Sequence, residues 1–468
     1  MINNKLLING ELVDGHTNRD IINPATGSPF TTSSVASESQ AESAIAAAKA
    51  AFPGWAATPL EKRREAVSKF ADGIRDNAEE LAKTLTMEQG KPLSESKNEV
   101  MYTEGFMRYF ASSGFDPEVI QDDDDYRIEV RYKPLGVVVG ITPWNLPLLL
   151  GANKIGPALI TGNTLVLKPA PTTPLTSLML GTIAQNIFPP GVLNIIADNN
   201  DLGALLSNHV DVAKVTFTGS TATGKKIAQT TASSLKRLTL ELGGNDAGIV
   251  LDDIDVQETA AKILGSSFIN CGQLCIALKR LYVPTNMYDE MCGALSDLAK
   301  ATKVGNGLDE GVEMGPLQNK MQFDKAKSYL EIAKKDGQII AGGNVRQSEG
   351  YFMEPTIVRN IDDGSALVDE EQFSPILPIV KYNKLDDVID AANDSKYGLG
   401  GSVWSQDVDR AVQVASKIDS GTVWVNHHVH FGPHIPFCGA KESGIGVEFG
   451  RDGIIEFTQH SVISISKR

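Results

Sequence analysis

The sequence predicts an α/β protein of two domains with a small antiparallel sheet attached. From residue 136 onward, short β-branched runs alternate with helical stretches, which is typical of βα repeats around a parallel, doubly wound sheet. The alternation resumes after Gly244 and continues to about residue 425, which indicates a second α/β domain. Residues 126–133 instead alternate apolar and charged side chains, as the half-buried strand of an antiparallel sheet does.

The elements follow this plan along the chain. Residues 38–115 are rich in Ala, Glu, Lys and Leu with spaced apolar positions, so several helices are expected there. The run at 249–251 opens the second sheet. Four apolar runs predict the strands of the first sheet, namely residues 137–139, 164–167, 192–196 and 214–217.

A second alternating segment, residues 461–466, lies at the C-terminal end. Together with residues 126–133 it predicts two strands that project from the body and pair or pack across a subunit interface. A surface hairpin on a monomer is the alternative that these residues leave open.

Length and charge limit the classes of partner. The chain has 468 residues, which is enough for two or three domains with large cores. Its 43 Lys and Arg against 58 Asp and Glu give a net charge of −15, which repels phosphate backbones and anionic membranes. We therefore expect neither nucleic acid nor a membrane as a partner.

The cysteines and the apolar stretches predict a cytoplasmic protein. The four cysteines are too few and too scattered for a disulfide framework, which favours a reducing compartment. Polar residues return soon after the N-terminal apolar run, unlike in a secretory signal. The longest apolar stretch, residues 135–151, is interrupted by prolines and polar residues and is too short to span a membrane.

Cys275 and Glu241 are candidates for a nucleophile and a base. A thiolate can attack an electron-poor carbon and hold it covalently, and a carboxylate can activate the water that releases it. Glu241 precedes Leu242 and a Gly-Gly pair, one supersecondary unit upstream of Cys275. Taken alone, a buried structural Cys and a strand-ending Glu stay open as alternatives.

A glycine-containing loop at residues 219–226 follows an apolar strand and precedes a helix, so its N–H groups could bind a phosphate. It nearly matches a P-loop, but Lys226 stands where that motif needs Ser or Thr to hold Mg²⁺. ATPase chemistry is therefore disfavoured. A dinucleotide diphosphate site and a purely structural turn both remain open.

Two other strand ends carry polar side chains. Asn145 lies between Pro143 and Pro147, so its amide is either an oxyanion donor held by a rigid loop or a cap of the next helix. Lys168 ends a strand where ligands of doubly wound sheets bind, so it either donates to ribose hydroxyls or is a solvated charge.

We expect no metal site. Cys271 and Cys275 have a C-x₃-C spacing, whereas zinc sites more often use C-x₂-C with a second ligand pair. The histidines at 427, 428, 430 and 434 lack an accompanying set of acidic or Cys ligands, so a pocket or a surface loop is favoured for them.

Seven ordered segments resemble the aldehyde dehydrogenase superfamily over essentially the whole chain. Their order and spacing make chance agreement negligible. The segments are Pro143-Trp144-Asn145, Lys168-Pro169-Ala170, Phe217-Thr218-Gly219-Ser220-Thr221, Leu240-Glu241-Leu242-Gly243-Gly244, Gly272-Gln273-Leu274-Cys275, Glu370-Glu371-Gln372-Phe373-Ser374-Pro375 and Pro436-Phe437-Cys438-Gly439.

The resemblance implies a particular domain arrangement. A Rossmann-like cofactor domain would comprise residues 1–120 and 138–242, and a catalytic domain residues 243–441. Residues 121–137 and 442–468 would form an oligomerisation sheet, so we expect a homodimer or a homotetramer.

The resemblance also implies a hydrolytic, NAD(P)-dependent reaction. Cys275 would attack the aldehyde carbon, and Asn145 with the Cys275 N–H would hold the oxyanion of the thiohemiacetal. Glu241 would activate the water that hydrolyses the resulting thioester to the carboxylic acid. Lys154 and Glu448 match positions that assist proton transfer. The implied cofactor-binding residues are Trp144, Lys168, Gly219, Ser220, Glu371 and Phe373.

Some positions depart from the family pattern. Pro171 replaces the Glu that usually bonds the adenosine ribose, so discrimination against a 2′-phosphate should weaken and both NAD and NADP should be used. Ser374 and Cys438 replace glycines, which puts the local backbone angles in question.

The expected substrate is a medium-sized neutral aldehyde, aliphatic or aromatic. In the family the loop at residues 426–436 helps line the substrate tunnel, and here it is rich in histidine, which predicts an apolar pocket with imidazole donors. No Arg stands among the expected lining residues to pair with a carboxylate. These residues are Leu146, Leu150, Asn153, Leu274, Ile276, His428 and Phe431.

Two rival functions follow from the same motifs. Acylating relatives use coenzyme A in place of water and lack the base, so Glu241 favours hydrolysis. A catalytically silent, dinucleotide-binding structural relative is the main alternative. The joint presence of Cys275, Asn145 and Glu241 speaks against it.

Overall fold

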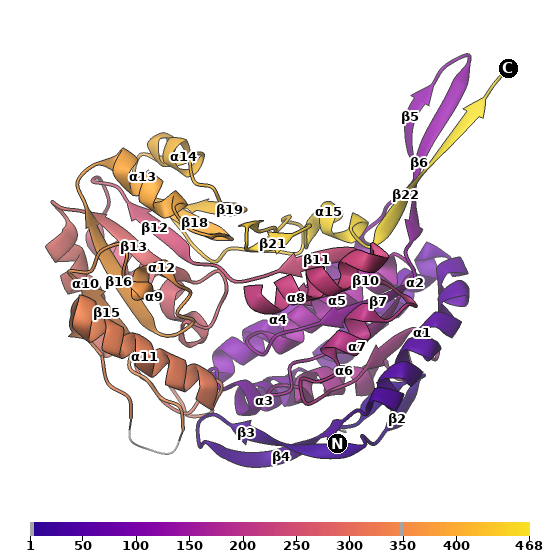
Figure 1. Cartoon of the computed structure of the whole chain (residues 1–468), viewed down its shortest axis with the longest axis horizontal. Helices are drawn as coiled ribbons and strands as arrows, with labels where there is room; N and C mark the ends of the chain where they lie inside the picture. The colour runs from indigo at the N-terminus through magenta and orange to yellow at the C-terminus, as the bar shows by residue number, and fades with distance from the viewer. Residues whose placement is uncertain (1–3, 347–349) are drawn as a thin grey trace.

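Two doubly wound sheets form the body of the protein, and a three-stranded sheet projects from it (Figure 1). The structure is a computed structural model that describes residues 4–346 and 350–468. It confirms the α/β fold with a small antiparallel sheet that the sequence predicts.

The first sheet has the strand order β2-β1-β9-β8-β7-β10-β11-β21, and the strands from β9 to β11 are parallel. The chain order reverses between β7 and β10, and ligands of such sheets bind at the carboxyl ends of the strands at this point. Strands β7 and β8 are buried along their whole length, as central parallel strands are. The parallel strands are β7 (Val137–Ile141), β8 (Thr164–Lys168), β9 (Leu193–Ile195), β10 (Val212–Thr218) and β11 (Arg237–Glu241).

Helices cover this sheet and precede it in the chain. The predicted helices in residues 38–115 are confirmed as four, and α1 begins with a capping box between Ser37 and Gln40. Four further helices connect the parallel strands. The helices are α1 (Glu38–Ala57), α2 (Leu60–Asp76), α3 (Ala78–Gln89), α4 (Leu93–Ser112), α5 (Pro147–Ile160), α6 (Leu175–Ala184), α7 (Gly203–Asn208) and α8 (Thr221–Thr231).

The N-terminal segment adds antiparallel strands. Strands β1 (Leu6–Ile8) and β2 (Glu11–Val13) extend the first sheet beyond β9. Strands β3 (Thr17–Asn23) and β4 (Ser28–Val35) form a separate hairpin.

The second sheet has the order β14-β15-β16-β13-β12-β18-β19, and only β14 at one edge is antiparallel to its neighbour. Its strands are β12 (Asp246–Val250), β13 (Leu278–Pro284), β14 (Gln338–Ala341), β15 (Thr356–Arg359), β16 (Ile376–Tyr382), β18 (Gly400–Trp404) and β19 (Thr422–Val425). Its longer helices are α9 (Val256–Phe268), α10 (Tyr288–Ala301), α11 (Lys320–Asp336), α13 (Leu385–Asn393) and α14 (Val408–Ala415).

The two sheets face each other with opposite ends of their parallel strands. The motif residues of the first sheet follow the carboxyl ends of β7, β8, β10 and β11. The motif residues of the second sheet, in the turns at 243–245, 269–277 and 371–375, precede the amino ends of β12, β13 and β16. Loops from both sheets therefore meet where the sheets face each other.

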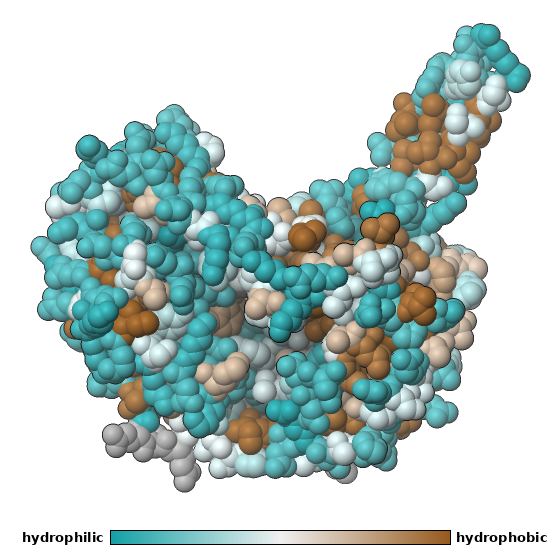
Figure 2. Space-filling view, viewed as in Figure 1, coloured by the Kyte–Doolittle hydropathy of each residue, from teal (hydrophilic) through white to brown (hydrophobic). Residues whose placement is uncertain are grey.

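The projecting sheet has the order β22-β6-β5 and is antiparallel throughout (Figure 1). Its strands β5 (Glu118–Asp122), β6 (Tyr126–Pro134) and β22 (Thr458–Ser466) include both alternating segments, so these strand predictions are confirmed. We call this sheet the arm. Apolar side chains gather on it in Figure 2, and those most exposed are Val119, Ile120, Tyr126, Val462 and Ile465.

The segment after residue 441 does not belong to the arm throughout. Strand β21 (Gly444–Ile445) pairs with β11 at the edge of the first sheet, and helix α15 (Gly450–Ile455) follows before β22 begins. The predicted boundary at 442 therefore lies too early for the C-terminal strand of the arm. In the part of the chain that is described, no helix has the length and apolar character needed to cross a membrane.

Candidate active site

Cys275 follows a turn with an unusual backbone. Asn270 (φ 51°), Cys271 (φ 58°) and Gly272 (φ 71°) all lie in the left-handed region, which non-glycine residues rarely enter. A Cβ on Gly272 would lie 2.5 Å from the carbonyl oxygen of Ser374, so both its conformation and its surroundings require glycine. We call residues 270–275, which end at the predicted nucleophile Cys275, the nucleophile turn.

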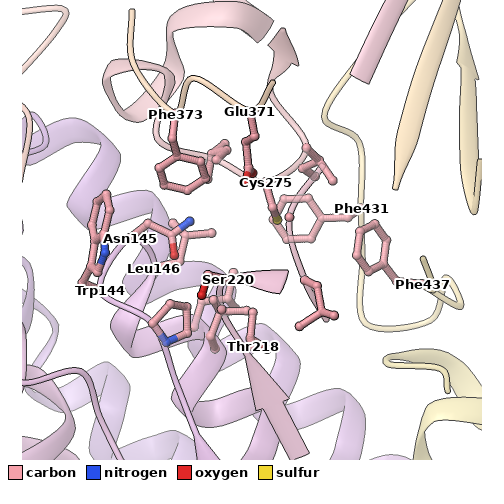
Figure 3. Close-up of a pocket in the computed structure, with 18 of the residues that line it drawn as sticks. Trp144, Asn145, Leu146, Thr218, Ser220, Cys275, Glu371, Phe373, Phe431 and Phe437 are labelled. Carbon is pink, nitrogen blue, oxygen red and sulfur yellow. The ribbon is translucent and has the colours of Figure 1, made fainter. Parts of the chain in front are cut away.

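The Cys275 thiol is partly exposed and lines a cavity between the two sheets (Figure 3). Burial raises the pKa of this thiol well above its usual range, and the carboxyl groups of Glu371, Glu241 and Asp246 raise it further. Without a ligand the thiol is therefore protonated at neutral pH, and nucleophilic attack requires loss of that proton.

The Asn145 side chain lies against the nucleophile turn. Its Nδ2 donates to the backbone carbonyl oxygen of Gln273 at 3.0 Å, and the backbone carbonyl oxygen of Asn145 accepts from Asn270 Nδ2 at 3.0 Å. The N-cap residue of α5 is Leu146, and the N–H groups of the first turn of that helix are accepted by Glu99, so the capping alternative for Asn145 is not met. Figure 3 shows Asn145 pointing toward the middle of the cavity.

A buried ion pair supports Asn145 from behind. Lys91 Nζ bonds Glu99 Oε2 at 2.6 Å and also donates to the Asn145 carbonyl oxygen at 2.8 Å. The other oxygen of Glu99 accepts the N–H groups of Leu148 and Leu149 at 3.0 and 3.2 Å, in the first turn of α5. Because every partner is buried, the Asn145 backbone has little freedom to move.

Glu241 ends β11 and is buried, with 4% of its surface exposed. Within the described residues, neither carboxyl oxygen has a hydrogen-bond partner. Burial raises the pKa of Glu241 well above its usual value, and the carboxylate of Glu448 raises it further. In this position Glu241 is set back from the cavity that Cys275 lines.

Lys154 and Glu448 form a buried ion pair next to these groups. Lys154 Nζ also donates to Thr218 Oγ1 at 2.8 Å, and Asn153 Nδ2 donates to Glu448 Oε2 at 2.5 Å. Asn153 therefore belongs to this cluster and does not line the cavity, contrary to its expected place in the substrate pocket.

The glycine loop after β10 opens toward the cavity. Gly219 N donates to the Glu241 carbonyl oxygen at 3.0 Å, and Ser220 caps α8 by accepting from Thr223 N at 3.3 Å. Both residues line the cavity. The N-terminus of an 11-residue helix therefore faces it, which is a favourable position for a phosphate.

The Lys168 side chain lies outside the cavity and is buried with an acidic partner. Its Nζ bonds Asp198 Oδ1 at 2.7 Å, and the other Asp198 oxygen accepts the N–H groups of Asp201 and Leu202, each at 3.0 Å. The alternative of a solvated lysine is therefore wrong.

Glu371 and Phe373 reach the cavity from the second sheet. Glu371 Oε1 accepts from Gly244 N at 3.2 Å, and a Cβ on Gly243 would lie 2.5 Å from Glu371 Oε2, so a side chain there would displace the Glu371 carboxylate. The Phe373 ring packs edge-on against Trp144 with centroids 5.5 Å apart. Among the residues described, Phe373 has a positive φ but Ser374 and Cys438 do not, so these two replacements of glycine cause no strain.

Most of the predicted site residues line this one cavity, although they come from five separate regions of the chain. The predicted residues in its wall are Trp144, Asn145, Leu146, Leu150, Gly219, Ser220, Leu274, Cys275, Ile276, Glu371, Phe373 and Phe431. The predicted residues outside the wall are Asn153, Lys154, Lys168, Glu241, His428 and Glu448.

His428 differs from the expectation of an imidazole donor in the pocket. Its ring is buried next to the nucleophile turn and packs at a tilt against Trp424, with ring centroids 4.6 Å apart. Its Nε2 lies 3.0 Å from the carbonyl oxygen of Ile276. The loop that follows β19 instead contributes Phe431 to this cavity, and Val429 and Phe431 to a second hollow beside it. The pocket is therefore more apolar than predicted.

The cavity also has lining residues that the sequence does not predict. Gln322 and Lys325 come from α11, and the Gln322 Oε1 atom is buried without a partner among the described residues. Phe437 and Phe449 close the cavity on the side of Phe431. Gln322 and Lys325 reach the site only because α11 packs against the loop of Glu371, and no local sequence pattern marks these two residues.

A second hollow continues outward from the apolar part of the cavity. The two share Leu146, Leu149, Leu274 and Phe431 in their walls. The outer hollow is more polar, and burial raises the pKa of its Glu95 to about 7. Its other residues are Lys91, Asn98, Glu99, Tyr102, Ile269, Asn270 and Val429.

The comparison with protein families decides what kind of site this is. The model of the "Aldehyde dehydrogenase family" matches residues 12–463. The chain belongs to the aldehyde dehydrogenase family. It is therefore an oxidoreductase of the family that oxidises aldehydes.

Individual family members resemble it over almost their whole length. An aldehyde dehydrogenase of Davidiella tassiana is 38% identical over 469 residues, 98% of this chain and 95% of that protein. A mitochondrial aldehyde dehydrogenase of Leishmania tarentolae is 37% identical over 476 residues, 100% and 96% of the two chains. These matches confirm the family that the seven motifs indicate.

Solved structures agree with the fold. Betaine aldehyde dehydrogenase of Staphylococcus aureus, solved in complex with NAD+, has a TM-score of 0.96 at 35% identity and covers 100% of this chain and 95% of that chain. A variant of the aldehyde dehydrogenase of Bacillus cereus has a TM-score of 0.96 at 36% identity, with 99% and 96% covered.

Proposed function

We propose that this family member oxidises an aldehyde to a carboxylic acid with NAD(P)+, through a thiohemiacetal and then a thioester on Cys275. One observation supports this most directly. The Asn145 amide is hydrogen-bonded to the residue that precedes Leu274 and Cys275, in the cavity that the thiol lines. A nucleophile and a fixed oxyanion donor are thus held together.

In the first step the Cys275 thiol gives its proton to solvent, and the sulfur then bonds to the aldehyde carbon as the π electrons of the C=O bond move onto the aldehyde oxygen. Charge then develops on the aldehyde oxygen, where the Asn145 Nδ2–H and the Cys275 N–H would donate to it. The Lys91–Glu99 pair holds the Asn145 backbone, so these donors need little reorganisation as the charge forms.

The chemistry of the donors fits a dinucleotide cofactor. The N-terminus of α8 at Ser220 suits a diphosphate, and Lys168 with Glu371 supplies a donor and an acceptor for ribose hydroxyls. Gln322 Oε1 is a buried hydrogen-bond acceptor without a partner among the described residues, so it could accept a hydrogen bond from a bound cofactor. When bound, the nicotinamide would accept the hydride that leaves the thiohemiacetal carbon.

In the last step Glu241 would activate the water that hydrolyses the thioester. Its carboxyl group is set back from the cavity and, among the described residues, unpaired, so a change of side-chain rotamer would bring it beside the water that attacks the carbonyl carbon of the thioester. The proton taken from water can pass toward the adjacent Lys154–Glu448 pair, whose charge also acts on Glu241.

Both cofactors should be accepted. Pro171 offers no carboxylate to bond the adenosine ribose or to repel a 2′-phosphate. The positive charge of Lys168 is balanced by Asp198, so the phosphate gains no strong attraction either. We therefore propose use of NAD and NADP without a large preference.

The substrate we propose is a medium-sized neutral aldehyde, aliphatic or aromatic. Next to Cys275 the wall is apolar, with Leu146, Phe431, Phe437 and Phe449. Among the residues that line the outer hollow, the one lysine is already paired with Glu99, so an aldehyde with a carboxylate would find no free cation there.

We also propose that the arm joins copies of this chain into a homodimer or homotetramer. Members of the family are usually oligomeric, and the apolar side chains exposed on the arm would be covered in such an assembly.

The proposed reaction is tested by the absorbance of reduced nicotinamide formed from a panel of aldehydes with each cofactor. We expect formation with neutral aldehydes and NAD or NADP, and none from Cys275→Ala. Absence of product from the parent protein with every aldehyde would favour the catalytically silent relative. Best turnover with succinate semialdehyde would contradict the neutral substrate.

A further inference from the structure

Lys279 is a buried lysine to which the proposed reaction assigns no role. It is the second residue of β13, four positions after Cys275, and only 2% of its surface is exposed. Burying an ammonium group is costly unless the protein offers it specific partners. Its contacts therefore indicate what it does.

These contacts tie two loops of the site together. Lys279 Nζ donates to the carbonyl oxygen of Gly272 at 2.7 Å, inside the nucleophile turn. The same ammonium lies 4.9 Å from the centre of the Phe373 ring, within the range of a cation–π contact. The Lys279 carbonyl oxygen also accepts from Gln372 Nε2 at 2.9 Å. The residue thus joins the nucleophile turn to the loop of Glu371 and Phe373.

The surroundings of Lys279 carry negative charge. Burial lowers the pKa of its ammonium to about 8, while the carboxylates of Glu371 and Asp246 and the Cys275 thiol favour the charged form, and the ammonium of Lys325 opposes it. Lys279 is therefore mostly protonated at neutral pH.

The Cys275 thiolate requires a positive charge nearby. Glu371, Glu241 and Asp246 all disfavour a thiolate, and Lys279 is the cation that lowers the pKa of Cys275. A thiolate formed next to three carboxyl groups needs such a charge to offset them.

We propose that Lys279 is a positioning residue for the nucleophile. Its buried ammonium fixes the nucleophile turn against the cofactor loop and offsets the negative charge of the Cys275 thiolate. The significance for catalysis rests on the proposed function, but the state of the thiol can be measured without turnover.

The test is the rate at which iodoacetamide alkylates Cys275, followed by mass spectrometry across a range of pH. Lys279→Gln keeps a donor for the Gly272 carbonyl but removes the charge, Lys279→Arg keeps the charge, and Lys279→Met removes both. Lys381→Met is the matched control, because Lys381 Nζ also lies over an aromatic ring, 5.5 Å from the centre of Tyr288, but on the exposed end of β16.

We expect Lys279→Gln to raise the midpoint of alkylation by about one pH unit, which lowers the rate about ten-fold at a pH below that midpoint. Lys279→Arg should stay near the parent, and Lys381→Met should equal it. The thermal melting curve establishes that each variant is folded, and if Lys279→Met does not fold, the Gln and Arg pair still decides. A folded Lys279→Gln with unchanged midpoint and rate would overturn the proposal.

Aldehyde oxidation is measured on the same samples. If the parent alkylates at Cys275 with the expected dependence on Lys279 but oxidises no aldehyde, then the proposed function fails and the role of Lys279 in the state of the thiol stands.

Discussion

At the scale of residues, the site combines two groups whose burial favours the protonated form. Burial raises the pKa of both the Cys275 thiol and the Glu241 carboxyl above their usual values. Neutral groups are the cheaper ones to bury, and each becomes reactive only on losing its proton. Activity should therefore increase with pH.

The pH dependence of thioester hydrolysis tests this for Glu241. The base form exists above its pKa, and burial with Glu448 raises that pKa, so hydrolysis should increase as pH passes a midpoint well above the ordinary glutamate value of about 4.3. Decay of a pre-formed acyl-enzyme, measured in single turnover, gives the midpoint. A midpoint at the ordinary value would show that Glu241 titrates as an exposed group.

Position 171 tests the choice of cofactor. Pro171→Glu introduces a carboxylate next to the site of Lys168 and Asp198, so kcat/KM with NADP should fall by about ten-fold or more while that with NAD is kept or improved. Pro171→Gln is the matched control, because it has the same length without the charge. Equal losses with both cofactors in the Glu variant would contradict the electrostatic explanation.

At the scale of elements, the parallel strands, the four N-terminal helices and both strands of alternating pattern follow from local sequence. The sequence also predicts where strands end, and this makes Asn145, Lys168, Ser220 and Glu241 candidate site residues. The conformation of the turn that carries Cys275 could not be predicted from the sequence, because Asn270 and Cys271 adopt left-handed backbone angles that only tertiary contacts impose. The burial of His428 next to that turn has the same origin.

Gly272→Ala tests the nucleophile turn. The new Cβ would lie 2.5 Å from the Ser374 carbonyl oxygen at a φ of +71°, so we expect a loss of about 1–3 kcal/mol in the free energy of unfolding and slower alkylation of Cys275. Gly265→Ala in helix α9 is the control, since nothing lies within 4 Å of its added Cβ and the variant should gain about 0.5–1 kcal/mol. Equal stabilities in urea unfolding would mean that the turn is not constrained.

At the scale of the whole molecule, the proposed reaction site depends on two sheets that face each other with opposite ends of their strands. The first sheet supplies its carboxyl ends and the second its amino ends, so neither sheet alone holds Asn145 against Cys275. Sequence motifs name most residues of this junction. They do not reveal Gln322 and Lys325, whose helix α11 reaches the site only after the second sheet packs.

Assembly through the arm is a property of the same scale. Val462 is 63% exposed on β22, and Val462→Asp should reduce the proportion of oligomer seen by analytical ultracentrifugation, because a charge would be buried in the interface. Val408→Asp is the control, since Val408 is 54% exposed in α14, away from the arm. Unchanged oligomers in the Val462 variant would place the interface elsewhere.

The central claim is that Cys275 carries the substrate as a thioester that Glu241 releases. The most direct measurement is the intact mass of Glu241→Gln after mixing with a neutral aldehyde and NAD+. We predict one equivalent of reduced nicotinamide and a stable acyl group on Cys275, absent from the double variant with Cys275→Ala. Full turnover by Glu241→Gln with no acyl group on Cys275 would contradict the account.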